Sequence, residues 1–119
     1  MTVVGFDFGT TNSMASVVIG NDVINFLEDG KPIPSVVSFE GGKVEVGRKA
    51  HDKLTSAGLG VQGSTVRSPK TLLGREEQLI DGVRRDPLQM VEQVLSYVRQ
   101  HALQSNTVRD LKMDRVVAT

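Results

Sequence analysis

The sequence contains no cysteine and no tryptophan, and tyrosine occurs only once. Without cysteine the chain can form neither disulfide bonds nor thiolate metal sites, which fits a reducing compartment. No run of about 18 apolar residues is present, and residues 1–7 lack the basic-then-apolar pattern of a secretion signal. We therefore expect a cytoplasmic protein that is neither exported nor embedded in a membrane.

An excess of either charge is also missing, because 14 Lys and Arg residues balance 14 Asp and Glu residues. A chain without net charge has no long-range attraction for nucleic acid or an acidic membrane, so neither is an expected partner. The 119 residues suit one domain. A hydrophobic share of 39%, together with 12 glycines, approaches the globular norm and predicts a folded core.

Three β-type runs open the chain, at residues 3–8, 13–19 and 23–26. Polar and glycine-containing turns, residues 9–12 and 20–22, separate them. The first run is almost continuously apolar, as in a strand that is covered on both faces. This pattern predicts a three-stranded meander.

A second small sheet is expected further along, where residues 36–39 and 43–46 flank a turn at Glu40-Gly41-Gly42. Its glycines accept the positive φ angles of a tight hairpin. Residues 47–54 predict a short helix. Residues 55–68 are rich in Gly, Ser and Thr, and we assign them no firm structure.

Two helical segments are expected in the second half. Ser68 stands at a cap position and Pro69 at a first helical position, which predicts one or two turns. A longer helix is predicted from Asp86 to about Gln104, with Asp86 as its cap. Its expected core-facing stripe is Leu88, Val91, Leu95, Val98 and Ala102. Residues 115–119 predict the start of another strand.

The first turn carries the chemistry of a phosphate-binding loop. Gly9 would let the backbone approach a ligand, and consecutive loop amides can form an anion-binding nest. Thr10 and Thr11 add hydroxyl groups, and Asp7, at the end of the strand, would face a metal ion. Spacing alone leaves a second interpretation open, in which Thr and Asn side chains only close a turn.

The ten residues from Val4 to Ser13 resemble the first phosphate motif of the DnaK-type, 70-kDa heat-shock protein family. Further segments match that family in the same order, namely residues 34–39, 46–50, 70–75 and 116–119. These segments span nearly the whole chain, and their order is far more specific than any single motif.

The resemblance implies an α/β fold of the ribonuclease-H-like, actin-like ATPase class, present in part. It consists of an N-terminal mixed sheet with an inserted small α/β subdomain. We expect residues 1–34 to form the phosphate-loop hairpin sheet, residues 35–114 the inserted subdomain, and residues 115–119 the start of a returning core strand.

The same resemblance implies roles for individual residues. Asp7 would hold Mg²⁺ through water, Thr10 would help to place the attacking water, and Lys70 would contact the γ-phosphate. Lysine suits this contact because its ammonium group is a compact charge with three donors. The residues implied to bind ATP or ADP are Gly9, Thr10, Thr11 and Asn12. The residues implied to act in catalysis are Lys70, Asp7 and Thr10.

Two departures from the family pattern indicate a divergent member. Phe8 replaces an aliphatic residue, and Pro69 stands directly before Lys70. The family's second phosphate loop, opposing lobe and peptide-binding domain would all lie beyond Thr119. We therefore expect a fragment with little activity alone, whose intact protein binds ATP, client polypeptides and co-chaperones. Open strand edges would allow self-association.

Two other functions of the same superfamily remain as alternatives. One is a sugar or acetate kinase that shares the first loop, although the segment around Lys70 argues against it. The other is a filament-forming, actin-like protein.

Other motifs are set aside. Residues 58–63 match G-x-G-x-x-G, but no strand is predicted before them and no helix after them, so we interpret them as a loop. Asp7-Phe8-Gly9 spells a kinase magnesium motif but lies too early in the chain. His51 and His101 lack partners at metal or triad spacing.

Overall fold

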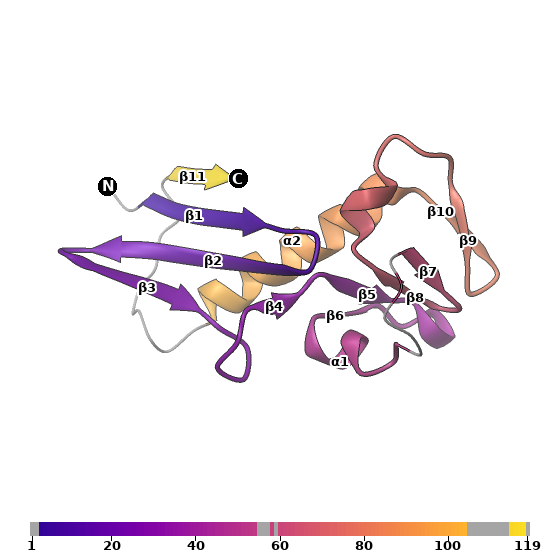
Figure 1. The fold of residues 1–119 in the computed structure, drawn as a ribbon, viewed down its shortest axis with the longest axis horizontal. Helices are drawn as coiled ribbons and strands as arrows, with labels where there is room; N and C mark the ends of the chain where they lie inside the picture. Colours follow the sequence, from indigo (N-terminus) through magenta and orange to yellow (C-terminus); the bar gives the residue numbers. More distant parts are fainter. Residues whose placement is uncertain (1–2, 55–57, 59, 105–114, 119) are drawn as a thin grey trace.

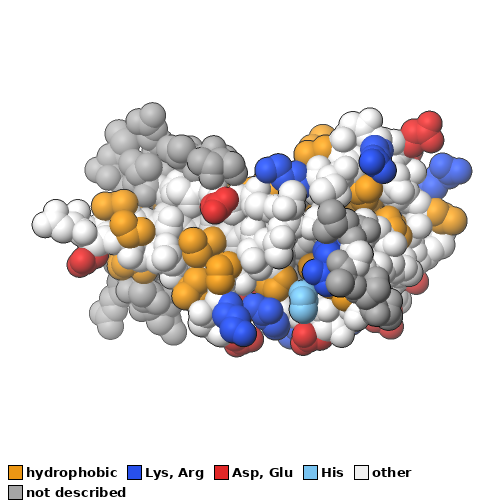
Figure 2. All heavy atoms as spheres, in the orientation of Figure 1, with side chains coloured by type: hydrophobic (Ala, Val, Ile, Leu, Met, Phe, Trp, Pro, Cys, Tyr) orange, Lys and Arg blue, Asp and Glu red, His pale blue; other side chains and the backbone are white. Residues whose placement is uncertain are grey.

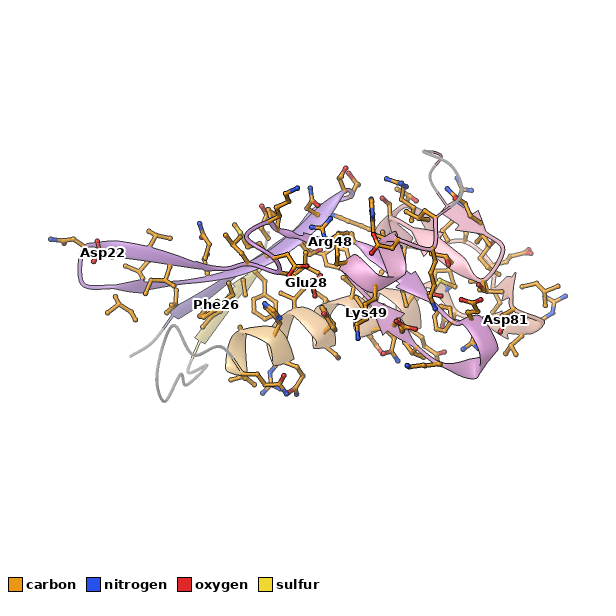
Figure 3. The ribbon with its side chains drawn as sticks, turned by 90° about the horizontal axis from the view of Figure 1, so that it is seen from below. Asp22, Phe26, Glu28, Arg48, Lys49 and Asp81 are labelled. Atoms are coloured by element: carbon orange, nitrogen blue, oxygen red, sulfur yellow. The ribbon has the colours of Figure 1, made fainter. Side chains whose placement is uncertain are left out.

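The computed structural model describes residues 3–54, 58, 60–104 and 115–118. The molecule is elongated, with extents of 47 × 27 × 23 Å. The main sheet lies at one end, short strands and turns lie at the other, and the long helix α2 runs beside both (Figure 1). Asp22 and Asp81 mark the opposite ends of the long axis in Figure 3.

The main sheet has the order β11-β1-β2-β3, and β4 pairs with β2 beside this path. Strands β1 (Val3–Phe8), β2 (Asn12–Ile19) and β3 (Asp22–Phe26) are antiparallel neighbours, which confirms the predicted meander. Strand β4 (Ile33–Pro34) is short, and β11 (Arg115–Ala118) runs parallel to β1. The sheet therefore joins the two ends of the described chain.

The second sheet begins with β5 (Val36–Ser38) and β6 (Glu45–Val46), which pair as predicted. They are joined through the 3₁₀ turn η1 (Glu40–Gly42), in which Gly41 and Gly42 have φ angles of 64° and 76°. The short helix α1 (Arg48–His51) follows within the range expected for it.

Two hairpins lie in the stretch after α1. Strands β7 (Gly60–Gln62) and β8 (Thr65–Arg67) extend the second sheet in the order β6-β5-β8-β7. Residues 55–68, to which the sequence assigned no firm structure, thus contain two strands among their described residues, because pairing with β5 orders β8. Strands β9 (Gln78–Ile80) and β10 (Val83–Arg85) form a separate hairpin.

Helix α2 (Pro87–Leu103) confirms the predicted long helix, and the Asp86 side chain caps it by accepting from the Leu88 N–H at 3.0 Å. The predicted stripe is wrong at Leu88, which is 54% exposed. A second apolar stripe, shifted by one residue, has the same helical period, so the sequence pattern alone did not show which stripe faces the core. The buried residues of α2 are Pro87, Met90, Val91, Val94, Val98 and Ala102.

One hydrophobic core joins the sheets to α2, and it includes Val4, Phe6, Val17, Met90 and Val94. Burial of these side chains is the main source of the fold's stability. On the face shown in Figure 2, the described Lys and Arg side chains are interspersed with Asp and Glu side chains. In the part of the chain that is described, no helix is both long and apolar enough to cross a membrane.

Candidate phosphate-binding site

The turn between β1 and β2 is closed by its own backbone. The Gly9 N–H donates to the Asn12 carbonyl oxygen at 3.0 Å. A Cβ atom at position 9 would lie 2.7 Å from that same oxygen, closer than packed atoms approach one another. The turn therefore requires glycine at this position. Thr10 and Thr11, at its tip, are exposed.

Asp7 lies one residue before the end of β1 and is exposed, whereas its neighbours Phe6 and Phe8 are buried in the core. This alternation follows from the period of two along a strand. Within the described residues, the Asp7 carboxylate forms neither a hydrogen bond nor an ion pair. It is therefore available to a ligand at the base of the turn.

Ser35, between β4 and β5, is hydrogen-bonded to the backbone of the turn. Its N–H donates to the Thr11 carbonyl oxygen at 3.0 Å, and its hydroxyl donates to the Gly9 carbonyl oxygen at 2.9 Å. The Oγ atoms of Ser13 and Ser35 lie 2.7 Å apart. Because the Ser35 hydroxyl proton is already used on Gly9, Ser13 is the donor of this bond.

Ser68 approaches the turn from the second sheet. Its hydroxyl donates to the Thr10 carbonyl oxygen, and its N–H donates to the Ser35 carbonyl oxygen at 2.8 Å. The predicted helical turn exists as the 3₁₀ helix η2 (Pro69–Leu72). Ser68 is its N-cap residue and Pro69 lies in its first turn, as predicted, but the Ser68 side chain makes no capping hydrogen bond. The hydroxyl is used on the turn instead.

Lys70 reaches the same turn from η2. Its Nζ donates to the Phe8 carbonyl oxygen at 3.0 Å and lies 5.8 Å from the centre of the Phe8 ring. Lys70 is exposed, so its ammonium group remains accessible from solvent. The structure thus brings Lys70 to the loop although the two are about sixty residues apart in the sequence.

The turn offers donors to an anion. Among the described residues, the backbone N–H groups of Thr10 and Thr11 have no hydrogen-bond partner within the protein. Two hydroxyl groups and the Lys70 ammonium group lie on the same loop or contact it. Backbone donors on consecutive residues, combined with a cation, are typical of phosphate-binding sites. Asp7 adds the carboxylate that a hydrated Mg²⁺ prefers.

The sequence interpretation found most of these groups but not the two serines. Ser35 lies in one of the segments that match the family, and Ser68 lies two residues before Lys70. These positions, in or beside segments that match the family, were the available signal that the two serines belong to the site. Their contacts with the turn depend on how the two sheets meet, which no local pattern encodes.

The dinucleotide-type motif is not a phosphate loop. Its described residues Gly60–Gln62 form β7, and Gly63 sits in the turn to β8 with a φ of 62°, so these glycines serve a hairpin rather than the loop we expected. His101 Nε2 lies 2.8 Å from the Leu27 carbonyl oxygen, and His51 faces Asp52. Across the described ranges, no three His, Asp or Glu side chains group as metal ligands.

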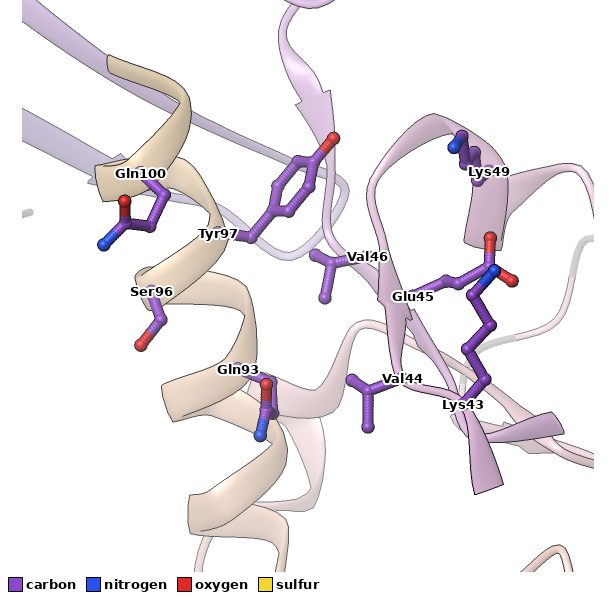
Figure 4. A pocket seen from close by; sticks show the side chains of 9 residues that line it. All are labelled: Lys43, Val44, Glu45, Val46, Lys49, Gln93, Ser96, Tyr97 and Gln100. Atoms are coloured by element: carbon purple, nitrogen blue, oxygen red, sulfur yellow. The ribbon is translucent and has the colours of Figure 1, made fainter. Parts of the chain in front are cut away.

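A pocket of about 420 Å³ lies elsewhere, between α2 and the segment that leads into α1 (Figure 4). Two lysines, a glutamate, two valines, several polar side chains and the only tyrosine line it. The lining residues are Lys43, Val44, Glu45, Val46, Lys49, Gln93, Ser96, Tyr97 and Gln100. None of them belongs to the turn between β1 and β2.

Comparison with known proteins agrees with the interpretation of this turn as a phosphate-binding loop. The family profile described as Hsp70 protein matches residues 3–112. The "Chaperone protein DnaK" of Ureaplasma urealyticum serovar 10 is 34% identical over 103 residues, which are 84% of this chain and 16% of that protein. The DnaK of Mycoplasmoides gallisepticum is 32% identical over 107 residues, 84% of this chain and 17% of the relative.

The DnaK of Mycoplasmopsis pulmonis is 28% identical over 103 residues, again 84% of this chain and 16% of the relative. The chain thus spans about one sixth of the length of these relatives. The profile covers most of the chain, including every predicted site residue from Asp7 to Lys70. The chain therefore belongs to the Hsp70 protein family.

Proposed function

We propose that this chain forms part of the ATP-binding, ATP-hydrolysing domain of a DnaK-like chaperone. It supplies the first phosphate loop and a catalytic lysine. The observation that carries the proposal is the approach of the Lys70 ammonium group to the turn, at 3.0 Å from the Phe8 carbonyl oxygen. A turn that only reversed the chain would have no need of a cation delivered from a distant segment.

The residues fit a magnesium nucleotide. The N–H groups of Thr10 and Thr11 and the exposed threonine hydroxyls would bind phosphate oxygens, with Gly9 and Asn12 shaping the turn. Asp7 would hold Mg²⁺ through water, and the ion would neutralise phosphate charge. Thr10 would help to place the attacking water, and Lys70 would stabilise the negative charge that develops on the γ-phosphate.

The proposal extends to the fold and the partners. The mixed α/β architecture, with β11 parallel to β1, supports a ribonuclease-H-like, actin-like ATPase fold. We assign residues 1–34 to the hairpin sheet, 35–114 to an inserted subdomain and 115–119 to a returning strand. In the intact protein the partners would be ATP or ADP, client polypeptides and co-chaperones, in the cytoplasm.

The sugar or acetate kinase and filament alternatives are less well supported. The Hsp70 profile and the DnaK relatives match most of the chain, and they favour the chaperone-type ATPase over both. A kinase would require a metabolite as phosphoryl acceptor. ATP hydrolysis by the intact protein without any added acceptor would support our proposal.

The decisive experiment removes the lysine from the protein that contains this chain. We expect Lys70→Ala to lower the rate of ATP hydrolysis by on the order of a hundredfold, as for other donors to developing charge. Lys31→Ala is the control, because Lys31 is also exposed but lies in the turn before β4. Unchanged hydrolysis by Lys70→Ala would contradict the proposed role.

The isolated 119-residue chain should hydrolyse little or no ATP, because it would provide only part of the site. Steady turnover by the isolated chain that is abolished by Asp7→Asn or Lys70→Ala would refute this expectation.

A further inference from the structure

We infer that Ser35 and Ser68 are positioning residues that set the direction of the phosphate loop's N–H groups. The inference rests on the proposed function and concerns how the loop is prepared for phosphate. Neither serine is needed as a direct ligand. Each serine instead donates hydrogen bonds to carbonyl oxygens of the loop.

Three consecutive carbonyl oxygens of the loop are held from one side. The Ser35 hydroxyl binds that of Gly9, the Ser68 hydroxyl binds that of Thr10, and the Ser35 N–H binds that of Thr11. Both serines are almost fully buried, with exposed fractions of 1% and 0%. The bonds that their hydroxyl groups form with the loop are partly buried, so a lost partner would leave a partly buried polar group unsatisfied.

Because the peptide bond is planar, fixing the carbonyl groups also fixes the directions of the backbone N–H donors. All described peptide bonds are trans, so each carbonyl points opposite to the N–H of the following residue. With the Gly9 and Thr10 carbonyls fixed toward the serines, the N–H groups of Thr10 and Thr11 point away from them. Those are the two donors that have no partner among the described residues.

Ser68 is held in a conformation that serines rarely adopt. Its φ and ψ angles are 57° and 62°, in the left-handed region, although it is not glycine. Such backbone strain persists only where surrounding contacts determine it, and it concentrates at functional sites. Here the strained residue directs its hydroxyl to the loop, while its carbonyl accepts from the Thr71 hydroxyl at 2.7 Å within the turn that carries Lys70.

Ser68 therefore couples the two halves of the site. Its N–H binds the Ser35 carbonyl, its hydroxyl binds the loop, and Lys70 follows two residues later. A change at Ser68 should disturb both the donor directions and the lysine. A serine that only filled the core would affect stability but not the loop.

The test compares Ser35→Ala and Ser68→Ala with Ser38→Ala in the protein that contains this chain. Ser38 is a matched control because it is also fully buried, in β5, but its hydroxyl faces the Glu40 N–H at 3.4 Å. Selective ¹⁵N-threonine labelling would report the amide resonances of Thr10 and Thr11, and calorimetry would report the affinity for Mg·ATP.

We expect both loop variants to shift the Thr10 and Thr11 amide resonances and to weaken Mg·ATP binding by about tenfold, the loss of roughly one partly buried hydrogen bond. Ser38→Ala should leave both readouts unchanged. Ser68→Gly separates positioning from stability, because glycine relieves the backbone strain but lacks the hydroxyl. Ser68→Gly should therefore remain folded but still bind Mg·ATP more weakly than the parental protein.

Parental resonances and parental affinity in Ser35→Ala and Ser68→Gly would overturn the inference. If the parental protein binds no Mg·ATP, the proposed function fails, while the amide resonances still decide whether the serines orient the loop. Loss of affinity in Ser38→Ala to the same extent would also overturn it, since the effect would then be general.

Discussion

At the scale of single residues, Gly9 imposes the strictest requirement on the loop. We predict that Gly9→Ala destabilises the fold by about 1–3 kcal/mol, as overpacking commonly does, because its Cβ would lie 2.7 Å from a backbone oxygen that cannot yield like a side chain. The variant should also weaken Mg·ATP binding, since the Gly9–Asn12 bond that closes the turn must break or stretch. Urea denaturation and calorimetry would measure the two effects.

Gly5→Ala provides the control for this substitution. Gly5 lies in β1, the strand that leads to Gly9, and its Cβ would meet only the Ser16 hydroxyl oxygen, at the ordinary contact distance of 3.5 Å. Gly5→Ala should therefore be close to neutral in both measurements. A Gly9→Ala variant as stable as Gly5→Ala would show that the turn tolerates a side chain.

The residues of the candidate site were predictable only in part. The turn, Asp7 and Lys70 stand in motifs that keep their order along the chain, so a resemblance could identify them. Ser35 and Ser68 were not predicted as loop contacts, because a short polar side chain next to a proline is a common cap or turn signal. Only the meeting of the two sheets selects the carbonyl that each hydroxyl binds.

At the scale of elements, Glu28 ties both helices to the main sheet. It lies after β3, where its Oε1 accepts from the Arg48 N–H at the start of α1 at 2.7 Å, and its Oε2 accepts from the Tyr97 hydroxyl of α2. Figure 3 shows Glu28 beside Arg48. Gly47 has no room for a side chain there, since a Cβ would lie 2.8 Å from Glu28 Oε1.

This link predicts the titration of Tyr97. Burial, and then the hydrogen bond to Glu28, raise the pKa of the Tyr97 phenol well above its ordinary value. Because the folded pKa is raised, the stabilising effect is complete below the unfolded pKa of about 10 and is lost as the pH rises toward the folded value. The chain contains no other tyrosine and no tryptophan, so phenolate absorbance reports this residue alone.

We expect Glu28→Gln to lower the midpoint of this absorbance titration, because it removes the anionic acceptor. The control is Glu92→Gln, which changes the same charge on the exposed face of α2. Tyr97→Phe should reduce the free energy of unfolding at neutral pH by about 0.5–1.5 kcal/mol, the usual contribution of one hydrogen bond. A titration midpoint that Glu28→Gln leaves unchanged would contradict the link.

The elements with strong local sequence patterns were predictable, whereas the short strands that form only by pairing with other strands were not. The meander and the capped helix α2 carry periodic patterns and cap residues over many positions. Strands β7 to β10 have three residues each, too few for a period to show. The turn at Asp81 and Gly82, with φ angles of 52° and 77°, was the available hairpin signal for β9 and β10.

At the scale of the whole molecule, three strands of the main sheet each have one neighbour among the described residues: β3 and β11 at the ends of its path, and the two-residue β4 beside it. Edge strands offer unpaired backbone groups to other chains. The far end of the β2–β3 hairpin also exposes apolar side chains, including Val18 at 59% and Val23 at 64%. These features make a second copy of the isolated chain a plausible partner for the sheet.

We therefore predict that the isolated 119-residue chain self-associates as its concentration rises, as measured by light scattering. Val23→Lys should reduce the association, because a lysine on an edge strand opposes pairing with another chain. Val83→Lys is the matched control, since Val83 is also exposed but lies in the separate β9–β10 hairpin. A chain that stays monomeric at every concentration would contradict the prediction, and equal effects of both lysines would place the contact outside the sheet edge.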